Sequence, residues 1–84
     1  MYFTYILKSI NYPKTYVGHT NNLERRLFEH NSGLGNFTKR YCLWKIIYKE
    51  EYETEEESVK RETYFKTAAG RRWMKKNLFA TPEC

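Results

Sequence analysis

The first twenty residues contain two short runs in which β-branched and aromatic residues dominate. Residues 2–7 (YFTYIL) and 15–18 (TYVG) are separated by the polar, turn-forming sequence SINYPK. Runs of this composition on either side of a turn predict a β-hairpin. Residues 44–50 (WKIIYKE) have the same character and predict a third strand.

Between the second and third runs, the apolar residues change to helical spacing. Leu23 and Leu27 lie one turn apart and define an apolar stripe over residues 22–31. Asn21 can cap this helix, with Glu24 three positions further on, and the NSG sequence that follows closes it. The pattern therefore predicts a helix over residues 22–31.

A second pair of capping residues, Thr54 and Glu57, predicts a helix that begins there. We expect this helix to run through about Ala69 and to stop at Gly70. Its apolar positions predict a buried side that comprises Val59, Phe65 and Ala69.

Two segments lie outside these elements. Residues 33–40 are polar and predict a loop, followed by a short helical piece that begins at residue 41 or 42. The basic sequence RRWMKKNLF at 71–79 predicts a last helical stretch, which Trp73 docks onto the core.

The length of the chain sets the scale of the fold. We expect its 84 residues to form one domain over 1–84, with a core over about 2–73 and a basic C-terminal tail over 74–84. A chain of this size buries only ~60–65% of its unfolded surface, which leaves little room for a deep substrate cavity. The sequence lacks an apolar run of roughly 18 residues and a basic leader, so we expect no membrane span and a cytoplasmic location.

The charges are distributed unevenly along the chain. All ten acidic residues are glutamates, and six of them lie in EEYETEEE at 50–57. The rest of the chain carries fifteen basic and four acidic side chains, a balance that favours a polyanion such as nucleic acid as the partner. Solvation of a small basic domain explains the same excess, and charge alone does not choose between the two.

Three charged or polar side chains stand out from the helical patterns. Arg26 and His30 fall on the border of the apolar stripe, one turn apart, and are expected to point toward the edge of the sheet. Glu62 projects from the buried arc of the later helix, where an isolated carboxylate costs roughly several kcal/mol. A buried ion pair with a nearby arginine and a functional role explain Glu62 equally well.

Four sequence elements follow one another in an order known from one family: Tyr5-Ile6, Tyr16-Val17-Gly18, Arg26 with His30, and Lys60-Arg61-Glu62 before Lys66. This series resembles the GIY-YIG nuclease domain, in particular its small stand-alone members, which are similar to the nuclease module of the bacterial excision-repair endonuclease. The likeness covers Tyr2 to about Trp73. Phe3-Thr4 stands where the family has Gly-Ile, and Val17 stands where it has Ile.

The resemblance implies an α/β (α+β) fold with a small three-stranded, mostly antiparallel sheet flanked by helices. It also implies metal-dependent hydrolysis of DNA phosphodiesters, in DNA repair or recombination. Glu62 is then expected to hold one Mg²⁺ or Mn²⁺ ion, and Arg26 to clamp the scissile phosphate. Tyr16 is expected to act as general base with Tyr5 hydrogen-bonded beside it, and His30 to orient the phosphate or to take the proton instead.

Other positions are expected to support these residues. Gly18 is expected to let the backbone turn sharply beside the site, and His19 to contact a phosphate. Asn77 is the one candidate for the family's late asparagine, as structural support at best. The predicted DNA contacts comprise Gly18, His19, Arg25, Lys39 and Arg40, of which the last three are also explained as plain surface charge.

Ordinary structural roles remain open for several of these residues. Tyr5 and Tyr16 are also explained as a pair of cross-strand aromatics, and His30 as a residue that caps the C-terminal end of its helix. Two other classes of function stay open for the whole chain. One is a DNA-binding module with weak or no catalysis, and the other is a protein-interaction subunit of a repair complex that docks through the glutamate run at 50–57. For the nuclease itself, selection of the DNA by its structure, weak nicking and a targeting protein as partner all stay open.

Overall fold

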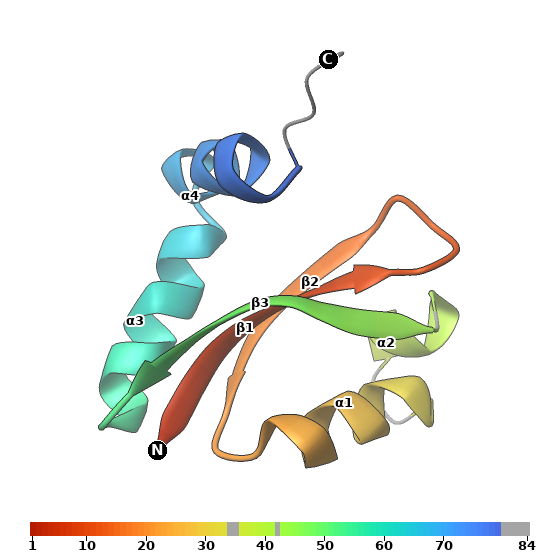
Figure 1. Cartoon of the computed structure of the whole chain (residues 1–84), viewed down its shortest axis with the longest axis horizontal. Helices are drawn as coiled ribbons and strands as arrows, with labels where there is room; N and C mark the ends of the chain where they lie inside the picture. The colour runs from red at the N-terminus through yellow and green to blue at the C-terminus, as the bar shows by residue number, and fades with distance from the viewer. Residues whose placement is uncertain (34–35, 42, 80–84) are drawn as a thin grey trace.

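A three-stranded antiparallel sheet forms the middle layer of the molecule (Figure 1). The computed structural model describes residues 1–33, 36–41 and 43–79. The strands are β1 (Tyr2–Ser9), β2 (Thr15–Thr20) and β3 (Trp44–Tyr52), in the order β2-β1-β3. The hairpin and the third strand that the sequence predicts are confirmed, and β2 is left with one open edge.

Helices cover both faces of this sheet (Figure 1). On one side lie α1 (Leu23–Asn31) and α2 (Asn36–Arg40), and on the other lie α3 (Glu55–Phe65), α4 (Ala68–Met74) and the π-helical turn η1 (Lys75–Phe79). The fold is therefore α+β, as predicted. Among the described residues, none of the helices is long and apolar enough to cross a membrane.

The central strand β1 divides the core into two halves. Its residues point alternately to the two faces, so Tyr5 and Leu7 pack with Trp44 on the α1 side, whereas Ile6 packs with Phe65 on the α3 side. Because both faces are covered, four successive residues of β1, at 4–7, are buried. The functional side chains are carried by elements that pack on this strand.

The first helix begins one residue later than predicted. The N-cap is Asn22, whose side chain accepts a hydrogen bond from the backbone N–H of Arg25, while Asn21 instead accepts one from the Arg25 guanidinium. The prediction of Asn21 as the cap is therefore wrong by one position. The capping box of Thr54 and Glu57 at the start of α3 is confirmed.

The predicted long second helix is two helices. α3 ends at Phe65, and α4 begins at Ala68 with Thr67 as its N-cap, so the prediction of one helix through Ala69 is wrong. Gly70 is no stop, because it lies inside α4, where an added Cβ would stand 2.0 Å from the backbone oxygen of Tyr64. Glycine is needed there to let α4 pack against the end of α3.

The break between α3 and α4 also changes which side chains are buried. Phe65 is 1% exposed, as predicted, but Val59 is 38% exposed and Ala69 lies on the surface. Those two assignments are wrong because they assumed one continuous helical phase. Ser58 occupies the buried position instead, and its carbonyl accepts a hydrogen bond from the Thr4 hydroxyl.

Residues 36–41 differ from the sequence prediction, whereas residues 71–79 agree with it. α2 lies within the predicted loop over 33–40, so that loop assignment is wrong. The helical piece expected at 41 or 42 is not formed at Tyr41, which lies in a turn, and residue 42 lies outside the described residues. The last helical stretch is confirmed, and Trp73, Met74 and Leu78 pack onto the core there.

Candidate active site

Tyr5 lies directly across from Gly18 in the sheet, and this pair shapes the edge of β2. The two residues are partners in the β1–β2 register, and an added Cβ on Gly18 would stand 2.6 Å from the Tyr5 hydroxyl. Gly18 lies inside β2 with no left-handed backbone, so the predicted sharp turn is wrong. Its missing side chain instead lets the Tyr5 ring pass over the strand toward the open edge.

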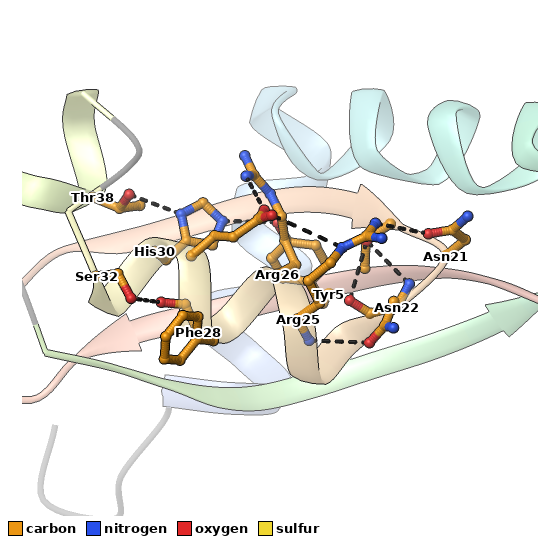
Figure 2. A network of polar contacts seen from close by, with 11 residues as sticks. Tyr5, Asn21, Asn22, Arg25, Arg26, Phe28, His30, Ser32 and Thr38 are labelled. Carbon is orange, nitrogen blue, oxygen red and sulfur yellow. Dashed lines mark hydrogen bonds and ion pairs between the residues drawn. The ribbon is translucent and has the colours of Figure 1, made fainter.

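Four of the predicted catalytic residues meet on the α1 side of the sheet: Tyr5, Tyr16, Arg26 and His30. Figure 2 shows three of them, Tyr5, Arg26 and His30. The Tyr5 hydroxyl and the Nε2 atom of His30 share a hydrogen bond of 3.0 Å, and the rings of Tyr16 and His30 are 4.7 Å apart. Arg26, one turn before His30 on α1, donates to Glu29 at 3.0 Å. Tyr5 and Tyr16 also favour the charged form of this guanidinium.

The surroundings of these groups set their charges at neutral pH. Burial raises the pKa of Tyr5 to about 12, although the neighbouring Arg26 opposes this rise. Burial together with the charge of Arg26 lowers the pKa of His30 to about 4. For Arg26, burial opposes the charged form, but hydrogen bonds with Glu29 and Tyr5 outweigh it and raise its pKa. The cluster therefore holds a neutral phenol, a neutral imidazole and a permanent cation.

One member of this cluster was missed by the sequence prediction. The Nδ1 atom of His30 shares a hydrogen bond of 2.8 Å with the hydroxyl of Thr38, and the indole N–H of Trp44 donates to the Thr38 carbonyl at 2.7 Å. Thr38 is 1% exposed, and so is His30. The sequence carries no helical period that would have indicated this, because α2 has only five residues.

Glu62 reaches the same edge of β2 from the opposite face, on α3. Its Oε1 atom lies 2.5 Å from Nδ1 of His19, and its Oε2 atom accepts a hydrogen bond of 2.6 Å from Lys66. His19 also lies 3.7 Å from a carboxylate oxygen of Glu55. The glutamate is thus in an ion pair with Lys66, rather than with an arginine, and it also pairs with the imidazole of His19.

The electrostatic field of Glu62 extends to the tyrosine cluster. Burial raises the pKa of Glu62, but the hydrogen bonds from Lys66 and His19 outweigh this and hold the pKa below its ordinary value. The carboxylate is therefore ionised at neutral pH, and its charge contributes to the raised pKa of Tyr5. Glu62 and Tyr5 approach the open edge of β2 from opposite faces of the sheet.

The Glu62 carboxylate has the chemistry of a magnesium ligand. Mg²⁺ prefers oxygen ligands and is commonly bound through one or two carboxylates, with waters at its other positions. Among the described residues, no group of three or more His, Cys, Asp or Glu side chains is placed to hold a metal. Oε1 of Glu62 pairs with His19 and Oε2 pairs with Lys66, and either partner can give way to a cation. The site thus fits a single ion on one carboxylate.

A groove of about 690 Å³ runs along β2 between the hairpin turn and the helices α3 and α4. It contains Tyr16 together with the cations of Lys14, Lys66 and Arg71, and no acidic side chain lines it within the described part of the chain. Lys14 and Arg71 were not predicted, because only the packing of α4 beside the hairpin brings them together. The whole lining comprises Pro13, Lys14, Thr15, Tyr16, Val17, Phe65, Lys66, Arg71 and Met74.

The other predicted contacts lie apart from this groove. Arg25, Lys39 and Arg40 are exposed on α1 and α2, and none of them lines it. Arg25 lies 3.9 Å from Glu29 and also donates to Asn21. The Asn77 side chain donates to the Trp73 carbonyl at 2.9 Å, which is a local helical contact.

Comparisons with known proteins agree with the sequence pattern. The model of the GIY-YIG catalytic domain family matches residues 1–77. A UPF0213 protein of Clostridium perfringens is 40% identical over 67 residues, which make up 79% of this chain and 71% of that protein. A UPF0213 protein of Staphylococcus saprophyticus is 31% identical over 75 residues, which make up 88% of this chain and 90% of that protein.

A solved structure with a similar fold is the solution NMR structure of a UPF0213 protein from Bacillus halodurans. It aligns with a TM-score of 0.53 over 98% of this chain and 88% of that one, at 23% sequence identity. At this identity, the likeness bears on the fold.

Proposed function

The chain belongs to the GIY-YIG family, a family of nucleases, and on that premise we propose that it is a divalent-metal-dependent DNA endonuclease. The observation that carries the proposal is the convergence of two tyrosines, an arginine and an ionised glutamate at the open edge of β2. Hydrolysis of a phosphodiester needs an activated water and positive charge beside the developing oxyanion. These four side chains supply groups of both kinds.

Arg26 is proposed to bind the scissile phosphate. It is fully charged, and its planar fork suits two parallel hydrogen bonds to phosphate oxygens. In the free protein a hydrogen bond to Glu29 holds the guanidinium in place. The side chain is thus oriented before a phosphate arrives, and little rotamer freedom remains to be lost on binding.

Tyr16 is proposed to be the general base. Tyr16 lines the cationic groove, where a DNA strand can reach it. Tyr5 suits this role less well, because its pKa is raised to about 12 and its ring is buried. We assign Tyr5 the role of a hydrogen-bonding neighbour, and His30 the role of holding Tyr5.

Glu62 is proposed to hold one Mg²⁺ or Mn²⁺ ion. Such an ion, when bound, supplies Lewis-acid charge stabilisation for phosphodiester hydrolysis. The residues of this chain prepare the site, since Lys66 and His19 keep the carboxylate ionised. Both then become free to contact phosphate oxygens when they leave Glu62.

The DNA strand is proposed to follow the groove along β2. Lys14, Lys66 and Arg71 place three positive charges beside Tyr16 there, which suits a phosphate backbone. Arg25, Lys39 and Arg40, on α1 and α2, provide further charge for contacts that carry no sequence information. We propose DNA repair or recombination as the setting, with the DNA target chosen by its shape or by a targeting protein.

A cleavage assay with a matched glutamate pair tests this proposal. Labelled plasmid, single-stranded, flap and branched DNAs are incubated with Mg²⁺ or Mn²⁺, or with a chelator. The parent is compared with Glu62→Gln and with Glu56→Gln, an exposed glutamate on the same helix. We expect metal-dependent cleavage that falls at least about 100-fold in Glu62→Gln and is unchanged in Glu56→Gln.

Two outcomes contradict the proposal. Cleavage that persists in the chelator or in Glu62→Gln overturns the role of Glu62 and its ion. DNA binding by the parent without cleavage of any substrate supports a DNA-binding module instead.

A further inference from the structure

We propose that Thr38 is a positioning residue of the site, which fixes the tautomer of His30 and thereby the direction of the Tyr5 hydroxyl. The two links of this chain are short: Thr38 Oγ1 lies 2.8 Å from His30 Nδ1, and His30 Nε2 lies 3.0 Å from the Tyr5 oxygen. All three residues are at most 2% exposed. Solvent therefore has little access to any link, and the protein must settle its own proton positions.

The direction of the protons follows from what each group is able to donate. Among the described residues, the Tyr5 hydroxyl shares one side-chain hydrogen bond, with Nε2 of His30, and a buried hydroxyl proton left without an acceptor is costly. The Tyr5 hydroxyl proton therefore points to His30, and Nε2 is its acceptor. A neutral imidazole carries one proton, so the proton of His30 lies on Nδ1 and is donated to the Thr38 hydroxyl.

Thr38 is itself held in place by a hydrogen bond from Trp44, so its position relative to His30 is fixed. The indole N–H of Trp44 donates to the Thr38 carbonyl at 2.7 Å. Trp44 is held in turn by Asn31 at the end of α1, through a pair of hydrogen bonds of 2.7 and 3.1 Å to its backbone. α2 is thereby tied to the start of β3 and to the helix that carries Arg26 and His30.

The position of Thr38 in α2 gives this contact a second consequence. Its side chain points inward to His30, while the next two residues of the same short helix, Lys39 and Arg40, are exposed. The element that presents cations to the outside therefore also holds the buried imidazole. Displacement of α2 would be transmitted to the Tyr5 hydroxyl through two successive hydrogen bonds.

The ring nitrogens of His30 report this arrangement directly. In the parent protein, labelled with ¹⁵N histidine at pH 7, two-bond ¹H–¹⁵N correlation spectra should show the His30 proton on Nδ1. Thr38→Val keeps the shape of the side chain but removes the acceptor, and should move the proton to Nε2 or produce a mixture. Thr38→Ser keeps the hydroxyl and should restore the Nδ1 proton.

Cleavage supplies the second readout, which rests on the proposed nuclease function. We expect the cleavage rate constant of Thr38→Val to fall about tenfold, as for other residues that orient a ligand or catalytic group from behind. The DNA concentration at half-maximal rate should not change, and Thr38→Ser should stay close to the parent.

The two readouts separate the failure of this inference from the failure of the nuclease proposal. A His30 proton on Nε2 in the parent overturns the inference, and this spectrum requires no variant to fold. An unchanged Nδ1 tautomer in folded Thr38→Val also overturns it. A parent that cleaves no DNA but shows the expected tautomers contradicts the nuclease proposal alone.

Discussion

Two arginines of this protein each lie beside one glutamate and two tyrosines. We call the Arg61 cluster closed, because its arginine and both of its tyrosines bind the carboxylate of the glutamate. Arg61 on α3 donates twice to Glu50 on β3, at 2.9 and 3.3 Å. The hydroxyls of Tyr48 and Tyr52 donate to the same carboxylate at 2.5 Å each. Each Glu50 oxygen thus accepts two hydrogen bonds, which leaves this carboxylate poorly suited to bind a metal.

The Arg26 cluster is built from the same residue types with a different connection. Arg26 and Glu29 lie three residues apart on one helix and share a single bond of 3.0 Å. Tyr5 and Tyr16 favour the charged form of the Arg26 guanidinium, but the Tyr5 hydroxyl bonds to His30 rather than to Glu29.

The difference shows how one set of side chains serves two purposes. The Arg61 pair joins a strand to a helix, and the Arg61 side chain also lies 4.5 Å from the ring centre of Phe65, so it stabilises the packing of α3. The Arg26 pair stays within α1 and joins no other element. We therefore expect loss of the first to reduce stability, and loss of the second to reduce activity.

A matched pair of tyrosine variants should give the largest separation between the clusters. Tyr16→Phe removes the proposed general base, and we expect cleavage to fall at least about 100-fold. Tyr48→Phe removes one hydrogen bond to Glu50 and should cost about 1 kcal/mol of unfolding free energy without a change in cleavage. Cleavage rates and urea unfolding curves measure the two effects, and equal cleavage by both variants contradicts the division.

Opening of the closed cluster should have the next largest effect. Glu50→Gln leaves Arg61 without its ionised partner. The pair is only partly buried, so we expect a loss of about 2 kcal/mol in unfolding free energy, between the values for surface and buried pairs. In a domain of this size the thermal midpoint should fall by roughly 8–16 °C. A midpoint close to that of the parent would show that the network is dispensable.

The two clusters should also lose stability in different pH ranges, with a smaller effect. His30 has a pKa of about 4 when folded and binds a proton near pH 6.5 when unfolded, so stability should decline as pH falls from 6.5 to 4. The pKa of Glu50 is lowered: burial opposes this, but hydrogen bonds from Tyr48, Tyr52 and Arg61 outweigh it.

The Glu50 contribution is therefore present above its ordinary pKa of 4.5 and is lost as the pH falls below it. Thermal midpoints measured from pH 7 to pH 2.5 should show both declines in the parent. Glu50→Gln should keep the first decline and reduce the second. If Glu50→Gln instead loses the decline between pH 6.5 and 4, the assignment of that decline to His30 is wrong.

The sequence predicts most of the scaffold because its signals are local. Alternation in the strands and the capping box that begins at Thr54 depend on neighbours within a few positions, and the cap of α1 was misplaced by only one residue. α2 was missed because five residues show no period, and contacts made by Thr38 define it. Gly70 was misassigned because its cause is the backbone of α3, which is close only in the folded chain.

Some contacts of the candidate site follow from local sequence patterns, and others depend on how the chain folds. Tyr5, Tyr16, Arg26 and His30 come together because strand alternation and one helical turn place them on one face of the sheet, as the sequence pattern indicates. Lys66 lies four residues after Glu62, a local pairing, but the pairing of Glu62 with His19 depends on how α3 crosses β2. No local pattern reports that crossing.

A paired arginine-to-lysine exchange tests most directly whether the two clusters divide stability and catalysis between them. Cleavage rate and unfolding free energy are measured for Arg26→Lys and Arg61→Lys under the same conditions. We predict that Arg26→Lys loses most of its cleavage at nearly unchanged stability, whereas Arg61→Lys loses stability and cleaves normally per folded molecule. An Arg61→Lys protein that is folded but inactive, beside a fully active Arg26→Lys protein, would contradict this assignment.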